Sequence, residues 1–193
     1  MPISSSRAPP KKNQALLVSV MEFHHGVPLA PRRGVKKDTK RLHKILSKLG
    51  FQVTIHNDLT AEEIRQACRG KELDGGVELQ ADSVSISEED SFSPCFSIPI
   101  DSAVMFATAP GYSAFLHPLG SVFLQTLCDL LEEEGGRSLE VTQLMTRLNY
   151  RVAHNFEAKG RELGGKKEMP CFVTRLTRQV FPFADRLKEP LPL

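Results

Sequence analysis

The stretch Gln66-Ala67-Cys68-Arg69-Gly70 constrains the fold and the chemistry of this chain more than any other segment. It places one cysteine in a short motif that begins with glutamine and ends on arginine and glycine. Upstream, Thr60 and Glu63 have the spacing of a capping box, so a helix begins there and has little room before the cysteine. Downstream, the composition becomes acidic and rich in serine. The motif therefore lies where a folded region gives way to a linker.

Strand-like and helix-like patterns alternate on both sides of this motif. Short runs of apolar residues, or apolar residues that alternate with polar ones, predict strands at 15–21, 51–55, 102–108 and 171–181. Apolar residues at helical spacing predict helices that begin at Val35, at Gly120-Ser121 and at Ser138. Gly50 follows the first of these helical patterns as a stop. The alternation predicts a layered α/β fold in one domain.

Charge is balanced over the whole chain but not along it. The 193 residues carry 25 Lys/Arg and 23 Asp/Glu, whereas residues 71–98 carry 1 Lys/Arg and 7 Asp/Glu. This segment is predicted to be an acidic linker, with a disordered tail at 1–14 and a second tail at 187–193. Six Lys/Arg surround the apolar stripe of the helix that begins at Val35, which is typical of a solvated face. A nucleic-acid site would also need aromatic residues there, so we expect no nucleic-acid partner.

The cysteines and the hydropathy do not indicate a metal site, an exported chain or a membrane span. Cys68, Cys95, Cys128 and Cys171 lack metal-ligand spacing, and the last two have the apolar neighbours of buried thiols. Residues 1–14 lack the apolar core of a signal peptide, and the chain has no run of 18 apolar residues. We therefore expect a cytoplasmic protein with no metal, no other cofactor and no membrane partner.

The motif at 66–70 matches the signature around the nucleophile of caspases, and its surroundings resemble the same family. Residues 15–58 are similar to the start of a caspase large subunit. Residues 98–181 are similar to the small subunit, with Ile-Pro-Ile-Asp, Ala-Thr-Ala-Pro-Gly-Tyr and Lys-Lys-Glu-Met-Pro-Cys-Phe in order. The similarity is greatest to executioner-type caspases. It implies a remnant of the large subunit at 15–70, the inter-subunit linker at 71–98 and a small-subunit-like region at 99–186.

The resemblance also implies which residues would form an active site. Caspases cut after aspartate with a cysteine thiolate, a histidine and backbone donors for the oxyanion, while two arginines and a glutamine hold the substrate aspartate. By this resemblance Cys68 is the nucleophile, and Arg32 and Gln66 bind substrate. The position of the second arginine falls at Leu116. Asp82, followed by a small serine, lies where the family is cut between its subunits.

A central segment of the family is absent from this sequence by the same resemblance. Gln66 follows Ile64 by two residues, where caspases have two strands, two helices and the turn that supplies the histidine. His24 and His25 precede Cys68 by 44 and 43 residues, but their neighbours match the region after the first family strand. The resemblance thus implies a caspase-like α/β/α layered sheet that lacks two central strands. Without a histidine beside it, Cys68 is expected to be a mostly protonated thiol.

Three hypotheses about function follow from these features. The first is an inactive caspase homologue that binds intact caspases, as a homo- or heterodimer through its small-subunit region. The second is an active cysteine endopeptidase in apoptosis or differentiation, against which the missing histidine argues. The third is the product of a degenerate gene or an exon-skipped transcript without a stable fold, for which a cooperative thermal transition is the test.

The missing strands also predict where the fold would be weak. The strands at 15–21 and 102–108 would each lose a hydrogen-bonded neighbour, and unpaired backbone groups are costly when buried. The helices built to cover a wider sheet would lose part of their platform, so we expect exposed apolar surface around Leu42/Leu46 and Leu127/Leu131. A marginal or aggregation-prone monomer is the expected outcome, with the small-subunit half the better ordered part.

Overall fold

The computed structural model of the chain describes residues 13–23, 30–59, 98–109, 112–161 and 163–184. Several sequence predictions lie outside these residues and keep their status as predictions. They are the capping box at Thr60 and Glu63, the motif with Gln66 and Cys68, the cleavage site at Asp82, the two histidines His24 and His25, the acidic linker, and most of the N-terminal and all of the C-terminal tail.

The N-terminal half, residues 14–57, is one parallel strand pair covered by a helix. Strand β1 (Gln14–Ser19) runs parallel to β2 (Gln52–Asn57), with Leu17 opposite Ile55, and helix α1 (Val35–Lys48) connects them. Ile45 and Leu46 of α1 are buried. Gly50 has φ +80 just past the helix, a conformation that glycine adopts without strain, so the predicted stop is confirmed.

The C-terminal half, residues 98–184, contains two further strand pairs and two helices. Strand β3 (Ala103–Phe106) pairs antiparallel with β6 (Cys171–Thr174), and β4 (Leu116–His117) forms a short hairpin with β5 (Gly120–Ser121). Helices α3 (Val122–Glu132) and α4 (Val141–Asn155) follow. Their apolar faces supply most of the core, formed by Cys128, Leu130, Leu131, Leu144, Leu148 and Val152 together with Ile45 of α1.

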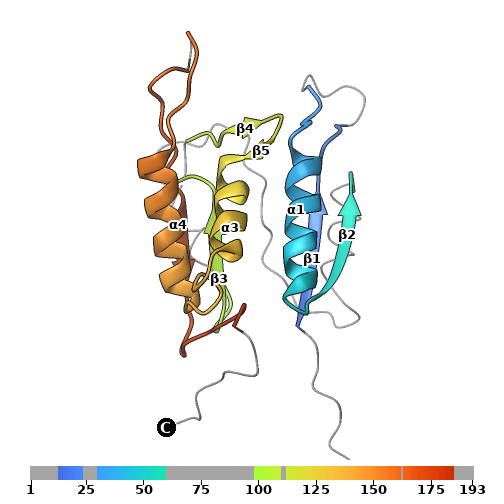
Figure 1. Cartoon of the computed structure of the whole chain (residues 1–193), viewed down its shortest axis with the longest axis vertical. Helices are drawn as coiled ribbons and strands as arrows, with labels where there is room; N and C mark the ends of the chain where they lie inside the picture. Colours follow the sequence, from blue (N-terminus) through green and yellow to red (C-terminus); the bar gives the residue numbers. More distant parts are fainter. Residues whose placement is uncertain (1–12, 24–29, 60–97, 110–111, 162, 185–193) are drawn as a thin grey trace, which may run out of the picture.

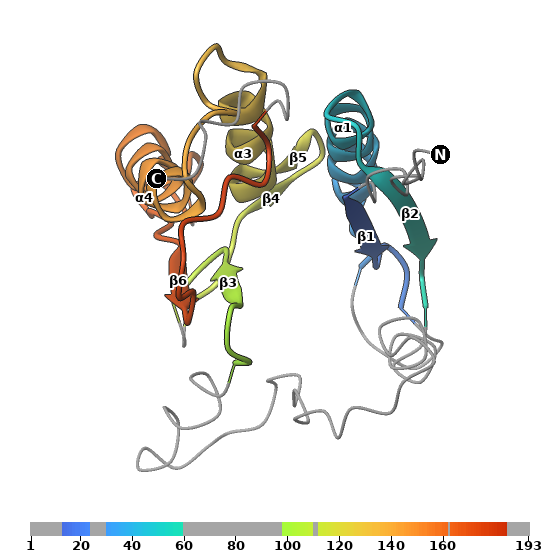
Figure 2. The same cartoon turned by 90° about the horizontal axis from the view of Figure 1, so that it is seen from below.

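All three described helices lie on the same side of the strands, with α1 beside α3 and α3 beside α4 (Figures 1 and 2). The described strands form three separate two-stranded sheets, and β1 does not pair with β3. In both views β1 is the strand of its pair that lies nearer to β3. The predicted α/β fold is thus confirmed, and the two halves meet through helices and the β4–β5 hairpin, without a sheet shared between their described strands.

The exposed apolar surface differs from the expectation. Leu46 and Leu131 are buried, at 6% and 0% exposure, and Leu42 and Leu127 are partly buried against the core. The helices thus keep their platform, and the prediction of exposed surface there was wrong. The exposed apolar side chains lie on the strands instead: Leu16 and Val18 of β1 are 41% and 38% exposed, and Phe106 of β3 is 40% exposed. The reason is that the helices pack on one another and on one face of the strands, which leaves the opposite strand face without a described cover.

Two predicted boundaries also need correction. Helix α4 is capped by Glu140, whose side chain accepts from the backbone of Thr142 and Gln143, whereas Ser138 donates to the Gly135 carbonyl. Strand β6 ends at Thr174 and does not continue through 171–181, because the backbone N–H of Thr177 turns to donate to Asp101 at 3.1 Å. The remainder of that run passes the start of α4, where Val141 donates to the Val180 carbonyl.

Candidate functional site

The segment that carries Arg32 is held by the ends of β1 and β2. The backbone N–H of Arg32 donates to the Met21 carbonyl at 2.8 Å. Met21 and Glu22 in turn donate their backbone N–H groups to Asp58 Oδ1 at 2.6 and 2.9 Å. The backbone donors of Glu22 and Met21 hold the pKa of Asp58 below its ordinary value. Asp58 therefore holds, as a carboxylate, the residues after β1 to which the segment with Arg32 is hydrogen-bonded.

The same segment packs directly against the β4–β5 hairpin. A Cβ atom added to Gly34 would lie 2.1 Å from the carbonyl oxygen of His117 and 2.9 Å from Leu116 Cδ1, so only glycine allows this approach. Arg32, two residues before Gly34, is exposed, and Leu116 is half-buried. The structure thus places the segment that carries Arg32 against the hairpin that carries Leu116, and the contact is made by Gly34.

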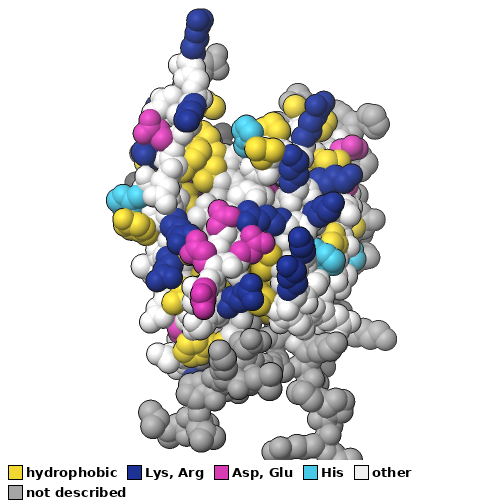
Figure 3. All heavy atoms as spheres, viewed as in Figure 1, with side chains coloured by type: hydrophobic (Ala, Val, Ile, Leu, Met, Phe, Trp, Pro, Cys, Tyr) yellow, Lys and Arg dark blue, Asp and Glu magenta, His cyan; other side chains and the backbone are white. Residues whose placement is uncertain are grey.

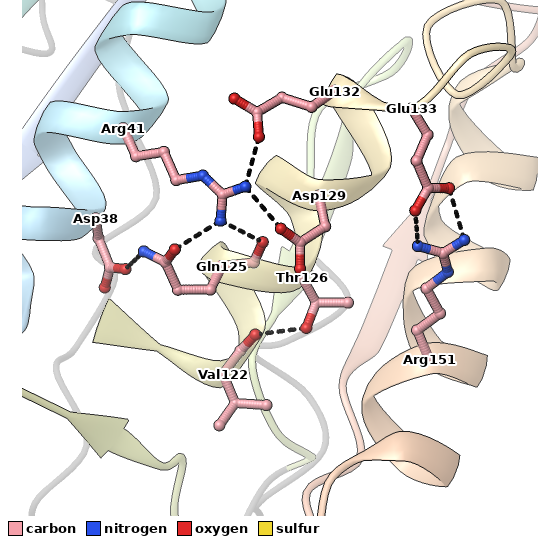
Figure 4. A network of polar contacts seen from close by, with 9 residues as sticks. All are labelled: Asp38, Arg41, Val122, Gln125, Thr126, Asp129, Glu132, Glu133 and Arg151. Carbon is pink, nitrogen blue, oxygen red and sulfur yellow. Dashed lines mark hydrogen bonds and ion pairs between the residues drawn. The ribbon is translucent and has the colours of Figure 1, made fainter. Parts of the chain in front are cut away.

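Asp38 ties helix α1 to the start of α3 (Figure 4). Its side chain is only 3% exposed, and it accepts hydrogen bonds from the Ser121 backbone N–H at 2.8 Å and from Gln125 Nε2 at 2.7 Å. A buried carboxylate needs such partners, because an unpaired one would be costly to desolvate. Asp38 thereby fixes the distance between the helix that follows Gly34 and the hairpin that carries Leu116.

Arg41 extends the same contact one turn along α1. Its guanidinium donates to Gln125 Oε1 at 2.7 Å, to Asp129 at 2.6 Å and to Glu132 at 2.5 Å (Figure 4). Burial disfavours the charge, but hydrogen bonds to Glu132 and Asp129 outweigh it and raise the pKa of Arg41. The hydrogen bond from Arg41 is also the main cause that lowers the pKa of Glu132. We call the group Asp38, Arg41, Ser121, Gln125, Asp129 and Glu132 the interhelical clamp.

The sequence did not reveal this clamp. Arg41 was counted with the bases of a solvated face, although its partners lie 84 to 91 residues away on α3. The available signal was Asp38, the one acidic residue in a helix whose other charged residues are all basic. A lone carboxylate of this kind indicates a specific partner, because it does not fit the pattern around it.

A buried carboxyl contacts the backbone of Phe115, the residue before Leu116. Glu168 is 2% exposed, and its Oε2 accepts from the backbone N–H of Phe115 at 2.7 Å. Its Oε1 is buried without a hydrogen-bond partner among the described residues. Burial raises the pKa of Glu168, and the Phe115 donor opposes this only in part. Phe115 also packs its ring on Phe156, with centroids 5.0 Å apart, so the residue before Leu116 is held by one aromatic contact and one hydrogen bond to a buried carboxyl.

The sequence profile of the family described as "Caspase domain" matches residues 12–67 and 64–181. The chain belongs to the caspase family. The two matched stretches meet at 64–67, where the caspase nucleophile motif begins.

Individual caspases show the same relationship over different spans. Caspase-7 of Gallus gallus is 39% identical over 121 residues, which cover 60% of this chain and 39% of that protein. Caspase-3 of Mesocricetus auratus is 26% identical over 240 residues, covering 89% of this chain and 84% of that protein. The crystal structure of caspase-1 from Spodoptera frugiperda superposes with a TM-score of 0.67 at 22% identity, over 87% of this chain and 90% of the other, and so shows the fold.

The alignment with caspase-3 of Mesocricetus auratus is longer than the part of this chain that it covers. It spans 240 positions, whereas 89% of the 193 residues is about 172 residues. About 68 positions of the alignment therefore set a caspase-3 residue against a gap in this chain.

The cysteines that the structure describes are not candidates for a caspase nucleophile. Cys128 is fully buried in the core, and burial raises the pKa of its thiol to about 11, so it is protonated at neutral pH. Cys171 is half-buried in β6, less than the sequence led us to expect, with Sγ 3.4 Å from the Thr108 carbonyl oxygen. Across the described ranges, no group of three or more His, Cys, Asp or Glu could hold a metal ion, and no described helix is long and apolar enough to cross a membrane.

Proposed function

We propose that this chain is a caspase-fold protein without peptidase activity, which acts by binding an intact caspase through residues 99–186. The observation that carries the proposal is that the caspase profile matches this chain in two pieces, which overlap at 64–67. About 68 alignment positions of caspase-3 have no counterpart here. By the family resemblance, these include the turn with the catalytic histidine and the oxyanion glycine, without which Cys68 has neither a base nor a complete oxyanion hole.

The substrate pocket supports the same conclusion. A substrate aspartate would meet Arg32 on one side, but on the other side it would meet the apolar side chain of Leu116, which lies beside Gly34. A substrate aspartate held by only one of the usual two arginines does not fully recover the free energy lost when it leaves water. Leaving such a buried charge without one partner costs on the order of 2–5 kcal/mol. Glu168, which accepts from the backbone of Phe115 next to Leu116, adds no positive charge to replace the missing arginine.

The first experiment measures cleavage of aspartate-containing peptides by the whole chain and by its Cys68→Ala variant. Removing a triad-type residue leaves only about 10³–10⁴-fold acceleration over water in well-studied hydrolases, so no turnover above background is expected from either protein. Robust turnover that disappears in Cys68→Ala would show an active endopeptidase, which is the competing hypothesis.

The second experiment tests the binding half of the proposal. In the family the final strand pairs subunits, and β6 has β3 on one edge and no described partner on its other edge. Sedimentation velocity of the chain mixed with an executioner caspase, itself inactivated by mutation of its cysteine, should show a 1:1 complex. Val173→Lys in β6 should weaken the complex, whereas Gln143→Lys on the exposed face of α4 should not. A mixture that sediments as two separate species would refute the binding role while leaving the first experiment valid.

Cleavage at Asp82 by an intact caspase belongs to the same proposal. The segment 71–98 is acidic and rich in serine, a composition that allows a chain to enter a protease groove. Mass spectrometry of the fragments after incubation with an executioner caspase should show one cut, after Asp82. An Asp82→Ala variant should resist it, and cuts only at other aspartates would count against the assignment.

A further inference from the structure

Four lysines form a single inclined row on the outer surface of α1. Lys36, Lys40, Lys44 and Lys48 follow one another at intervals of four residues, and all four are exposed. Residues four apart are neighbours on a helix surface, with a rise of about 6 Å from each to the next. We call this row the lysine ladder. Figure 3 shows Lys and Arg side chains running along α1, next to Asp and Glu side chains over α3.

The ladder works against the local stability of its own helix. Three consecutive pairs of like charges at i, i+4 repel one another, whereas a solvated helix face usually mixes the two signs. Lys36 and Lys37 also lie in the first turn of α1, where the helix dipole favours negative charge. The only acidic residue of that turn, Asp38, is turned inward and belongs to the interhelical clamp.

Within the described residues the ladder is not neutralised. Arg41 is the only base of α1 that forms an ion pair there, and it takes up both Asp129 and Glu132. Lys44 and Lys48 contribute to the low pKa of Glu132, so the negative charge of Glu132 offsets part of their positive potential. Lys36 and Lys40 lie one to two turns nearer the helix start, and they form no ion pair with a described residue. The positive potential is therefore strongest at the N-terminal end of the ladder.

We propose that the lysine ladder binds an extended acidic segment of a partner protein, with carboxylates on alternate residues. Side chains on the same side of an extended chain recur about every 6.7 Å, which matches the rise between successive lysines. An acidic peptide fits better than a nucleic acid, because α1 has no Phe, Tyr or Trp on which a base could stack. This inference does not depend on whether the chain has peptidase activity.

The test measures fluorescence anisotropy of a labelled peptide with five Asp-Ser repeats, titrated with the whole chain at about 50 mM salt, where surface charges are weakly screened. Lys36→Gln/Lys40→Gln is expected to weaken binding about threefold to tenfold, since each exposed ion pair contributes modestly. The matched control is Lys159→Gln/Lys166→Gln, which removes the same charge from exposed positions outside α1 and should leave affinity within about twofold. Equal weakening in both variants would show that only net charge matters and would overturn the proposal.

Three further arms test the charge of the peptide, the class of the partner and the accessibility of the ladder. A peptide of five Asn-Ser repeats should not bind, and if it binds as well as the acidic peptide the proposal fails. A thymidine decamer should compete poorly, because equal competition would indicate a nucleic-acid site. A chain whose seven acids in 71–98 are changed to Asn or Gln should bind the peptide as the natural chain does. If this variant binds the peptide and the natural chain does not, the acidic segment of the natural chain occupies the ladder, which also overturns the proposal.

Discussion

The two halves of the molecule bury their apolar residues to very different extents. In the C-terminal half, α3 and α4 enclose Cys128, Leu130, Leu131, Leu148 and Val152, all at 0–1% exposure. In the N-terminal half, α1 buries Ile45 and Leu46, but its strand β1 leaves Leu16 and Val18 about 40% exposed. A helix pair makes its own core, whereas a two-stranded sheet needs cover on both faces. Among the described residues, the first half of this caspase fold is therefore less completely enclosed than the second.

The largest expected effect comes from breaking the core of the C-terminal half. Leu148→Ala removes a side chain that is 1% exposed at the centre of the helix core, and should lower the free energy of unfolding by about 3–5 kcal/mol. Leu17→Ala on half-buried β1 should cost only about 1–2 kcal/mol. Urea denaturation followed by circular dichroism measures both. Equal losses would mean that the halves are equally well packed and would remove the basis of the comparison.

The next effect concerns the interhelical clamp, which joins the halves. Asp38→Ala leaves the Ser121 N–H and the Gln125 amide without their acceptor, and should lower the free energy of unfolding by about 1–3 kcal/mol. Because the halves share no described sheet, hydrogen exchange should accelerate through α1 and β1 while α4 keeps its protection. Lys37→Ala, on the exposed side of the same turn, is the control and should change neither quantity. Uniform acceleration in both halves would show that the clamp is not the joint between them.

Features that depend on residues close together in the sequence were predicted, and features that depend on distant residues were not. Helix α1 with its stop at Gly50, and α3 with its cap at Ser121, depend on neighbours within a few residues and were predicted. Glu140 displaced Ser138 as the cap of α4 because its carboxylate also reaches the backbone N–H of Val180, 40 residues away. Strand β6 was predicted too long because the turn after it depends on Asp101, 76 residues earlier.

The candidate site divides in the same way. The resemblance to caspases assigned Cys68, Gln66 and Asp82, which lie outside the described residues and stay predictions. Arg32 and Leu116 were assigned from the resemblance, and the contact at Gly34 brings their segments together. The partners of Asp38 were not predictable, since nothing local to α1 indicates that a hairpin 83 residues later supplies the donor. The buried carboxyl of Glu168 was missed for the same reason.

A smaller effect is the pH dependence that Glu168 gives to the C-terminal half. Its folded pKa is raised by burial above the ordinary 4.5, so the neutral form favours the fold. Its contribution to stability is therefore complete below about pH 4.5 and is lost as the pH rises through the folded pKa. Glu168→Gln keeps the shape and removes the titration. Its unfolding free energy relative to the natural chain should rise with pH above about 4.5.

Comparing the two proteins at each pH isolates this one group. The carboxyls of Glu132, Glu133 and Asp101 have lowered pKa values and give the opposite slope, since their contribution is lost as pH falls, but they are present in both proteins. Thermal unfolding at several pH values between about 4 and 8 supplies the difference. A difference that stays constant over this range would mean that Glu168 is paired or hydrated and does not favour its neutral form.

The double variant Leu16→Thr/Val18→Thr is expected to give the smallest change in stability. It is also the sharpest test of the exposed strand β1. Both side chains are already about 40% exposed, and threonine is β-branched, which suits a strand, so the unfolding free energy should change by less than about 1 kcal/mol. Self-association should nevertheless fall. Residues 14–19 form an uncharged strand with no proline, and no described strand covers the edge of β1 that faces away from β2. Such an edge pairs readily with another chain.

Sedimentation velocity over a range of concentrations tests this directly. The natural chain should form larger species as concentration rises, and the double variant should remain smaller at the same concentrations. Leu119→Thr is the matched control, because Leu119 is 61% exposed in the β4–β5 turn but belongs to no open strand edge. If Leu119→Thr suppresses association as well as the double variant does, general surface hydrophobicity and not the edge of β1 drives it. If the double substitution lowers the free energy of unfolding by more than about 2 kcal/mol, Leu16 and Val18 are packed against other residues, and the N-terminal half is better enclosed than its strands indicate.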